Sequence, residues 1–246
     1  MRLEYETDAG LGARAALGLI VLAADETLEA ESARLTRLPG VALYHSRIPM
    51  APVISQETLT CMAADLPAAA GLLPGPAARG VIGYGCTSAA AVIGSDNVAR
   101  AIRSTCPEAR VTDPLAALIA AGQHLGVRRL GFLSPYAAEV SQRLRERLVE
   151  AGFEIAAFGS FEAEDDRVVG RITPEAIAAG VLHVAEAAAC DALVISCTSL
   201  RCLDVIPQIE AQTGLPVLTS NQALAWHMLR LAGIEDRRPD FGRLLA

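Results

Sequence analysis

Hydrophobic residues fall along this chain in a pattern that predicts two halves with the same order of elements. Short apolar runs, which have the length and β-branched content of buried strands, alternate with longer stretches that suit helices. Each half opens with a strand, a helix and a second strand, at 16–22, 26–38 and 40–43 and again at 129–133, 140–151 and 152–155. This alternation predicts parallel sheets with helical crossovers.

A Cys-Thr-Ser motif at the end of a third apolar run indicates an internal repeat. The run is RGVIGYGCTS at 79–88 in the first half and CDALVISCTS at 190–199 in the second, with Cys86 and Cys197 in equivalent positions. We expect a helix directly after each motif, then a short strand, at 109–112 or 215–219, and a closing helix.

These elements predict an α/β protein with two pseudo-symmetric, Rossmann-like lobes, each a four-stranded parallel sheet flanked by helices. We assign 1–113 together with 219–246 to the first lobe, with the closing C-terminal helix packing back, and 114–218 to the second. Ligands of open α/β sheets bind beyond the carboxyl ends of the strands. Both Cys-Thr-Ser loops should therefore face one active-site cleft between the lobes.

The composition excludes several classes of protein. The 246 residues are 52% hydrophobic and 20% charged, which is typical of a chain that folds around a core. The net charge of −7 and the lack of a basic stripe argue against a nucleic-acid partner. No apolar run reaches the roughly 20 residues of a membrane span. The apolar run 15–24 follows acidic residues rather than a positive leader, so we expect a buried strand and a cytoplasmic protein.

The sequence contains no pattern typical of a metal or nucleotide site. Its six cysteines include no CxxC pair, and its four histidines are scattered, so we expect reduced thiols and no metal. Gly83-Tyr84-Gly85 lacks the third glycine of a dinucleotide fingerprint. We therefore expect no cofactor.

The two repeated motifs combine a reactive group with an anion cradle. A cysteine between a strand and a helix start lies at the positive end of the helix dipole, which should lower the pKa of its thiol. The following Thr and Ser offer hydroxyl and backbone N–H donors to a carboxylate. Alternatively, each cysteine is a small buried residue and the Thr-Ser pair caps a helix; the duplication of the motif favours function. The remaining cysteines are interpreted as structural, with Cys202 facing the core of the helix after Cys197.

Five groups of short motifs follow one another along nearly the whole chain. They are Leu19-Ile20-Val21 leading to Glu26-Thr27-Leu28-Glu29, Gly85-Cys86-Thr87-Ser88, Ser134-Pro135-Tyr136, Asp165-Asp166 with Val169-Gly170-Arg171, and Ser196-Cys197-Thr198-Ser199. In order and spacing they resemble the aspartate/glutamate racemase superfamily. Within it they are most similar to the branch of maleate cis-trans isomerases and arylmalonate decarboxylases, which includes a related ectoine-utilisation protein.

The resemblance implies two lobes that each supply a thiol to opposite sides of a small carboxylate substrate, and a homodimer or higher homo-oligomer. Cys86 then corresponds to the nucleophile or base of the first lobe, and Cys197 to its partner in the second. Tyr136 resembles a tyrosine that donates to a substrate carboxylate. Further donors would be Thr87, Ser88, Thr198 and Ser199.

Two positions depart from the maleate isomerases, because Asp25 and Asp166 stand where those proteins have asparagine. An ionised aspartate repels a carboxylate that asparagine would bind, so the substitutions favour a ligand with an ammonium or amide group. Alternatively, an aspartate caps a helix, and Asp25 is well placed to cap the helix at 26–38. Both interpretations stay open at this point.

We therefore predict a cofactor-independent isomerase or racemase of a dicarboxylate or amino-acid derivative, with Cys86 and Cys197 as its catalytic pair. One alternative is a decarboxylase that uses Cys197 as proton donor, since arylmalonate decarboxylases keep only the cysteine of the second lobe. A non-catalytic protein that binds or senses a small carboxylate would also fit the two lobes. So would a redox protein that forms a disulfide between the two cysteines, although the chain lacks a CxxC pair.

Overall fold

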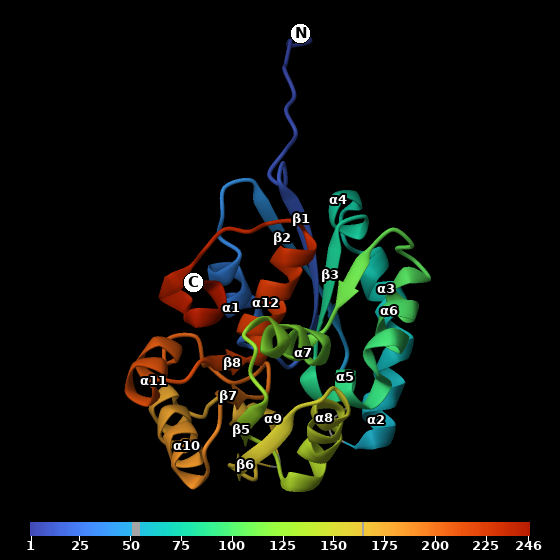
Figure 1. The fold of residues 1–246 in the computed structure, drawn as a ribbon. Coiled ribbons are helices and arrows are strands. Elements are labelled where there is room, and N and C mark those ends of the chain that lie inside the picture. Colours follow the sequence, from blue (N-terminus) through green and yellow to red (C-terminus); the bar gives the residue numbers. More distant parts are fainter. Residues whose placement is uncertain (51–54, 164) are drawn as a thin grey trace.

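Two parallel sheets of four strands each form the framework of the protein in this computed structural model, which describes residues 1–50, 55–163 and 165–246. The strands of the first are β1 (Ala15–Leu22), β2 (Val41–Ile48), β3 (Val81–Gly85) and β4 (Arg110–Thr112), in the order β2-β1-β3-β4. Those of the second are β5 (Arg129–Ser134), β6 (Glu154–Ser160), β7 (Ala192–Ile195) and β8 (Val217–Thr219), in the equivalent order β6-β5-β7-β8. The predicted α/β fold with two similar sheets is confirmed (Figure 1).

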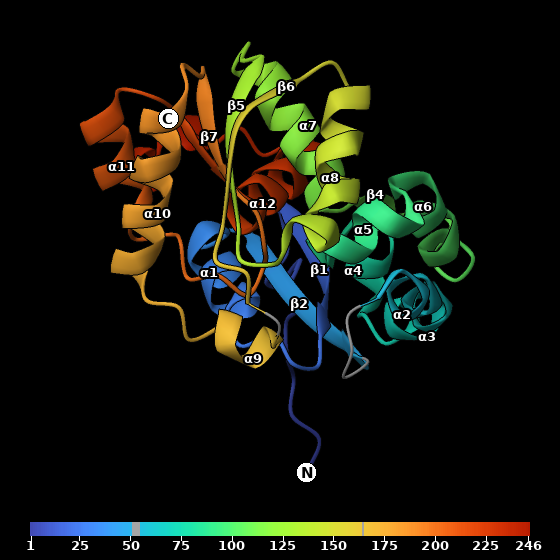
Figure 2. The same ribbon diagram turned by 90° about the horizontal axis from the view of Figure 1, so that it is seen from below.

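Helices cover both faces of each sheet (Figures 1 and 2). In the first half they are α1 (Leu28–Leu35), α2 (Gln56–Cys61), α3 (Leu66–Gly71), α4 (Gly75–Ala78), α5 (Thr87–Ile93), α6 (Ser95–Arg103) and α7 (Pro114–His124), with a 3-10 turn, η1 (Met62–Asp65). In the second they are α8 (Ala138–Glu150), α9 (Asp166–Val169), α10 (Pro174–Ala187), α11 (Ile206–Thr213) and α12 (Ser220–Leu231), followed by the 3-10 turns η2 (Pro239–Phe241) and η3 (Arg243–Leu245). None of the helices in the described ranges is long and apolar enough to cross a membrane.

The apolar run near the N-terminus forms β1, the strand between β2 and β3. All of its residues are buried, which explains why the run is continuously hydrophobic rather than alternating. The edge strand β2 extends to Ile48, beyond the predicted 40–43. Its last residues alternate between buried and exposed positions, so they do not form the continuous apolar run on which the prediction is based. Strand β6 likewise extends to Ser160, beyond the predicted 152–155, and its residues are only partly buried.

The closing helix α12 packs against α1, α7 and β3, all of which belong to the N-terminal part of the chain. It begins at a capping box in which Thr219 Oγ1 accepts from the Gln222 N–H (3.0 Å) and the Gln222 side chain accepts from the Thr219 N–H (3.4 Å). The largest core cluster includes Leu17 and Leu19 of β1 together with Phe132 of β5. The two halves thus share a continuous core; the residue boundaries that we assign to the lobes stay a prediction.

Candidate active site

The two Cys-Thr-Ser loops meet at one small pocket at the carboxyl ends of β3 and β7. The pocket has a volume of about 20 Å³, room for roughly one water molecule. Its lining combines three apolar side chains with the residues of both loops, a tyrosine and an aspartate: Leu22, Met50, Leu59, Cys86, Thr87, Ser88, Tyr136, Asp166, Cys197, Thr198 and Ser199. Of the site residues predicted from sequence, only Asp25 lies outside this lining.

Cys86 lies at the junction between β3 and α5, as the sequence predicts. It is the N-cap of α5, and its Sγ accepts from the Ala89 N–H at 3.4 Å. The preceding residue is Gly85, where a Cβ would clash with Leu28 Cδ2 of α1, so a larger residue would displace that helix side chain. The close approach of α1 to the strand end thus depends on the residue next to the cysteine.

Cys197, in contrast, lies on a loop, so the prediction of a helix directly after the second motif is wrong. The next helix, α11, begins only at Ile206, and Cys202 is a buried loop residue rather than part of a helix core. The reason is a side chain from the other half of the molecule. Glu31 Oε1 accepts from the Cys202 N–H (2.8 Å) and the Leu203 N–H (2.9 Å), and so replaces the backbone partners that a helix would offer.

The backbone of Cys197 is itself unusual. Its φ of 148° lies in a region that residues with a Cβ rarely adopt. The Ser220 Oγ at the start of α12 accepts from the Cys197 N–H (3.1 Å) and from Thr87 Oγ1 (2.9 Å), and thereby joins the two loops. Ser220 is not among the site residues predicted from the sequence, although the capping pattern of Thr219 and Gln222 indicates a helix start there, beyond the end of a strand.

A polar network surrounds the Cys197 thiol. The Tyr136 hydroxyl donates to Asp166 Oδ1 and lies 3.3 Å from Cys197 Sγ. Ser199 donates twice, from its hydroxyl to Asp166 Oδ2 (3.4 Å) and from its N–H to Cys197 Sγ (3.4 Å). The single proton of the Tyr136 hydroxyl therefore points to an aspartate of the protein, and this aspartate lines the same pocket as the two cysteines.

The hydroxyls of the two threonines also have protein partners. Thr87 donates to Ser220, and Thr198 Oγ1 donates to the Gly85 carbonyl at 3.5 Å. Both threonines still line the pocket, as does the half-buried Ser88. These contacts hold the two loops together across the lobes, so a ligand must compete with them for hydroxyl protons.

The electrostatics of the thiols differ from the expectation based on the helix dipole. Burial raises the pKa of Cys86 and of Cys197 to about 12, and the negative charge of Asp166 acts in the same direction on both. The N–H groups that point at the two sulfurs lower the pKa, but by less than burial raises it. The expected lowering is therefore wrong for these cysteines, which are protonated at neutral pH in this environment.

Asp25 accepts hydrogen bonds at the start of α1, as one interpretation expected, although the N-cap residue itself is Thr27. Its Oδ1 accepts from the N–H groups of Thr27 (2.7 Å) and Leu28 (2.8 Å), at the start of α1. Its Oδ2 is buried and has no partner among the described residues. Although Asp25 is absent from the pocket lining, its negative charge raises the pKa of Cys86, Cys197 and Asp166.

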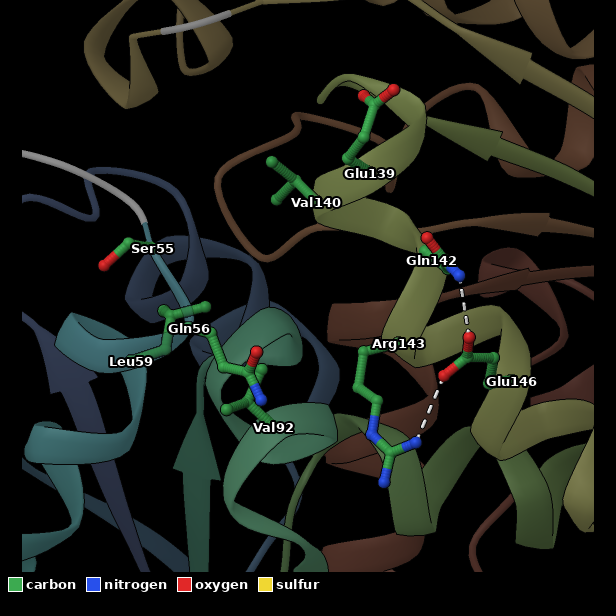
Figure 3. A pocket seen from close by; sticks show the side chains of 9 residues that line it. All are labelled: Ser55, Gln56, Leu59, Val92, Glu139, Val140, Gln142, Arg143 and Glu146. Atoms are coloured by element: carbon green, nitrogen blue, oxygen red, sulfur yellow. Dashed lines mark hydrogen bonds and ion pairs between the residues drawn. The ribbon is translucent and has the colours of Figure 1, made fainter.

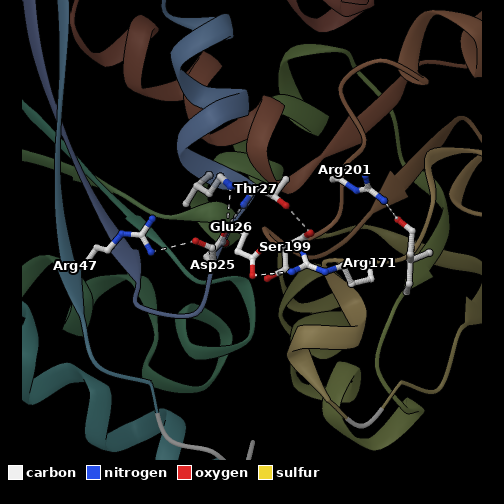
Figure 4. Close-up of polar contacts among 9 residues, drawn as sticks. Asp25, Glu26, Thr27, Arg47, Arg171, Ser199 and Arg201 are labelled. Carbon is white, nitrogen blue, oxygen red and sulfur yellow. Dashed lines mark hydrogen bonds and ion pairs between the residues drawn. The ribbon is translucent and has the colours of Figure 1, made fainter.

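The start of α1 is docked onto the loop that carries Cys197 (Figure 4). Thr27 Oγ1 donates to the Ser199 carbonyl (2.9 Å), and Glu26 forms an exposed ion pair with Arg171 (2.5 Å). On the other side, Arg47 of β2 donates to the carbonyls of three residues that lead into α1, among them Asp25 (3.1 Å). The first lobe thus positions its own cysteine and also the loop of the second lobe that carries Cys197.

A larger pocket of about 420 Å³ adjoins the site, between α2, α5 and α8 (Figure 3). Leu59 lines both pockets. The other side chains of the larger pocket are mostly polar: Ser55, Gln56, Val92, Glu139, Val140, Gln142, Arg143 and Glu146. Its cation, Arg143, is paired with Glu146 at 3.1 Å.

Comparison with known proteins relates most of the chain to maleate isomerases and to the arylmalonate decarboxylase family. The profile of the arylmalonate decarboxylase family matches residues 99–245. A maleate isomerase of Nocardia farcinica is 31% identical over 241 residues, which are 93% of this chain and 94% of that protein. Among solved structures, a maleate isomerase of Pseudomonas putida has the same fold, with a TM-score of 0.83 and 24% identity over 94% of this chain and 98% of that one.

A second solved structure is informative about chemistry in a relative. It is a cysteine-to-serine mutant of the Nocardia farcinica maleate cis-trans isomerase with a covalently bound succinylcysteine intermediate. It superimposes with a TM-score of 0.82 and 27% identity, over 94% of this chain and 98% of that one.

Proposed function

The chain belongs to the arylmalonate decarboxylase family, and on this premise we propose that it is a cofactor-independent isomerase of a small unsaturated carboxylate. The observation that carries the proposal is the pair of buried thiols, Cys86 and Cys197, which come from equivalent strand ends and line one pocket. Binding of a carboxylate does not require a thiol, whereas addition to a double bond needs a nucleophile at one carbon and a proton donor at the other, and two facing thiols can fill these roles.

In the proposed mechanism the Cys86 thiolate adds to one alkene carbon while the Cys197 S–H gives its proton to the other. The product is a saturated thioether whose former double bond can rotate. The Cys197 thiolate then removes a proton from the same carbon, the carbon–sulfur bond breaks, and the electron pair returns to Cys86. Atoms balance over the cycle, and only the geometry of the alkene has changed. The covalent succinylcysteine in the Nocardia relative supports the saturated intermediate.

The surroundings of the two thiols fit this division of roles. Cys86 lies at the N-terminus of α5, where an N–H and the helix dipole favour the thiolate. Cys197 lies beside Tyr136 and Asp166; Asp166 opposes both thiolates, but at Cys197 its charge is the largest influence after burial and favours the protonated thiol. Since burial disfavours both thiolates, the ionised Cys86 is a minor species that addition to the substrate consumes.

Single replacement of the two cysteines tests the proposal. We expect Cys86→Ser and Cys197→Ser each to lower the rate of cis-trans isomerisation of maleate or its monoamide by at least about 100-fold, because each removes one partner of the proton and thiol chemistry. Nuclear magnetic resonance distinguishes the isomers. Mass spectrometry of Cys197→Ser should detect protein increased by the mass of one substrate molecule. Cys61→Ser, at an exposed site, is the control.

A decarboxylase acting through Cys197 alone is the second candidate, because the family profile bears that name. It would lose activity in Cys197→Ser, retain it in Cys86→Ser, and release carbon dioxide from a malonate-type acid. Full isomerase activity in either cysteine variant would contradict the two-thiol mechanism.

A further inference from the structure

The charge of the pocket is one-sided. Among the described residues that line it, Asp166 is the charged side chain, and no lysine, arginine or histidine compensates for it. Residues 51–54 and 164 carry no positive charge in the sequence either. A ligand carboxylate beside an ionised Asp166 would therefore meet like charge in a partly desolvated site, where the repulsion is stronger than in water.

The hydrogen bonds near Asp166 also favour a ligand group that donates over one that accepts. An ionised carboxylate offers about four acceptor sites, and Asp166 uses two of them for the hydroxyls of Tyr136 and Ser199. Because the Tyr136 proton is directed to Asp166, this end of the pocket presents acceptors. Elsewhere in the lining, Thr87 and Ser88 carry hydroxyls that can donate to a carboxylate once they turn.

Asp25 adds a second buried negative charge behind the site. It is 2% exposed, and one of its oxygens has no hydrogen-bond partner among the described residues. Both donors that reach it among the described residues are backbone N–H groups, which do not neutralise its charge in full. Both aspartates thus shift the potential of the pocket in the direction that favours a cationic or neutral donor.

We propose that Asp166 makes this site select a ligand with one carboxylate and, in place of a second, a nitrogen that donates hydrogen bonds, as an amide or an ammonium group. The inference rests on the proposed function and specifies its substrate class. The carboxylate would bind near Thr87 and Ser88, and the nitrogen would donate to Asp166. Replacement of Asp166 by the isosteric asparagine should reverse the selection, because its amide can donate to a ligand carboxylate while its oxygen still accepts from Tyr136.

Binding of three unreactive four-carbon ligands tests this selection without any turnover. Succinate, its monoamide succinamate and 4-aminobutanoate share a chain length and have no double bond to which a thiol could add. Dissociation constants are measured by calorimetry at pH 8, because burial raises the pKa of Asp166 and the test needs its ionised form. In the unmodified protein succinamate or 4-aminobutanoate should bind at least about tenfold more tightly than succinate; the tighter of the two identifies an amide or an ammonium site.

The preference is expressed as the dissociation constant of succinate divided by that of the tighter-binding nitrogen ligand. Asp166→Asn should lower this ratio by at least about tenfold, through tighter binding of succinate. Asp165→Asn is the matched control: it removes a charge one residue away at an exposed helix cap, where asparagine caps equally well, and should retain the preference. Equal or tighter binding of succinate by the unmodified protein, no binding of either nitrogen ligand, or an unchanged ratio in Asp166→Asn would overturn the proposal. The ratio in the unmodified protein decides alone if the variant does not fold. Because these ligands cannot react, the outcome is independent of whether the two-thiol mechanism holds.

Discussion

Cys86 and Cys197 follow equivalent strands, yet their surroundings differ in ways that a shared tripeptide does not reveal. Cys86 caps a helix, whereas Cys197 lies on a strained loop beside Tyr136 and Asp166. Burial raises the pKa of both thiols to about 12. Their reactivity at neutral pH therefore depends on neighbouring charges, of which Asp166 is the one inside the pocket.

Asp166→Asn should make both thiols easier to ionise. The negative charge of Asp166 raises the pKa of Cys86 and Cys197, so its removal lowers both values and increases the thiolate fraction at a given pH below them. We expect alkylation of the two cysteines by iodoacetamide between pH 7 and 9 to be about three- to tenfold faster, equivalent to roughly half to one pKa unit. Peptide mass spectrometry measures the rates, and Asp165→Asn should leave them unchanged. An unaltered profile of rate against pH would contradict this electrostatic role.

At the scale of elements, α1 is the part of the first half that shapes the loop of the second. Glu31 on α1 accepts from the N–H groups of Cys202 and Leu203 and from Asn221 Nδ2 (2.8 Å) of α12. The side chain is 7% exposed, and burial raises its pKa. One carboxyl group thus replaces the hydrogen bonds that a helix after Cys197 would have made.

Glu31→Ala should destabilise the protein strongly, because it removes the acceptor of two buried backbone N–H groups and one of the two acceptors of the Asn221 amide. We expect the free energy of unfolding to fall by about 3 kcal/mol, measured by urea denaturation. Glu31→Gln retains one carbonyl oxygen and should cost less than the alanine variant. Equal stability of all three proteins would show that the loop finds other partners.

At the scale of the whole molecule, a continuous core holds two sheets so that their strand ends face a pocket of only about 20 Å³. A four-carbon acid needs more room, so binding must widen the site. Leu59 of α2 separates the site from the pocket of about 420 Å³ between α2, α5 and α8. The size of this one side chain should therefore limit which substituents a substrate can carry.

Leu59→Ala should connect the two pockets. We expect the variant to lower KM for an unsaturated acid with a bulky substituent relative to the unsubstituted acid, as initial-rate kinetics would measure. The cost in unfolding free energy should be about 2 to 3 kcal/mol, since Leu59 is 7% exposed and its removal leaves a cavity. Val92→Ala, which changes only the larger pocket, is the control. The same relative KM values in Leu59→Ala and the unmodified protein would show that Leu59 is not the barrier.

Local pattern was sufficient to predict the repeated order of strands and helices and to single out the Cys-Thr-Ser loops. A buried central strand such as β1 must be apolar throughout, and a helix start needs a cap, so both leave a signal in a few adjacent residues. The edge strand β2 was found only in part, because its partly exposed residues resemble those of a loop.

By itself, then, the sequence predicted the fold class and the pairing of Cys86 with Cys197, whereas Tyr136 and Asp166 were expected near them only through the family resemblance. Only the tertiary structure decided that no helix follows Cys197, that Ser220 joins the two loops, that Asp25 accepts hydrogen bonds at the start of α1 while Asp166 enters the pocket, and that burial outweighs the helix dipole at both thiols. The physical reason is that periodicity and caps act over a few neighbouring residues. Desolvation and charge, in contrast, depend on groups such as Glu31 and Ser220 that lie far away along the chain and meet the loops only in the folded protein.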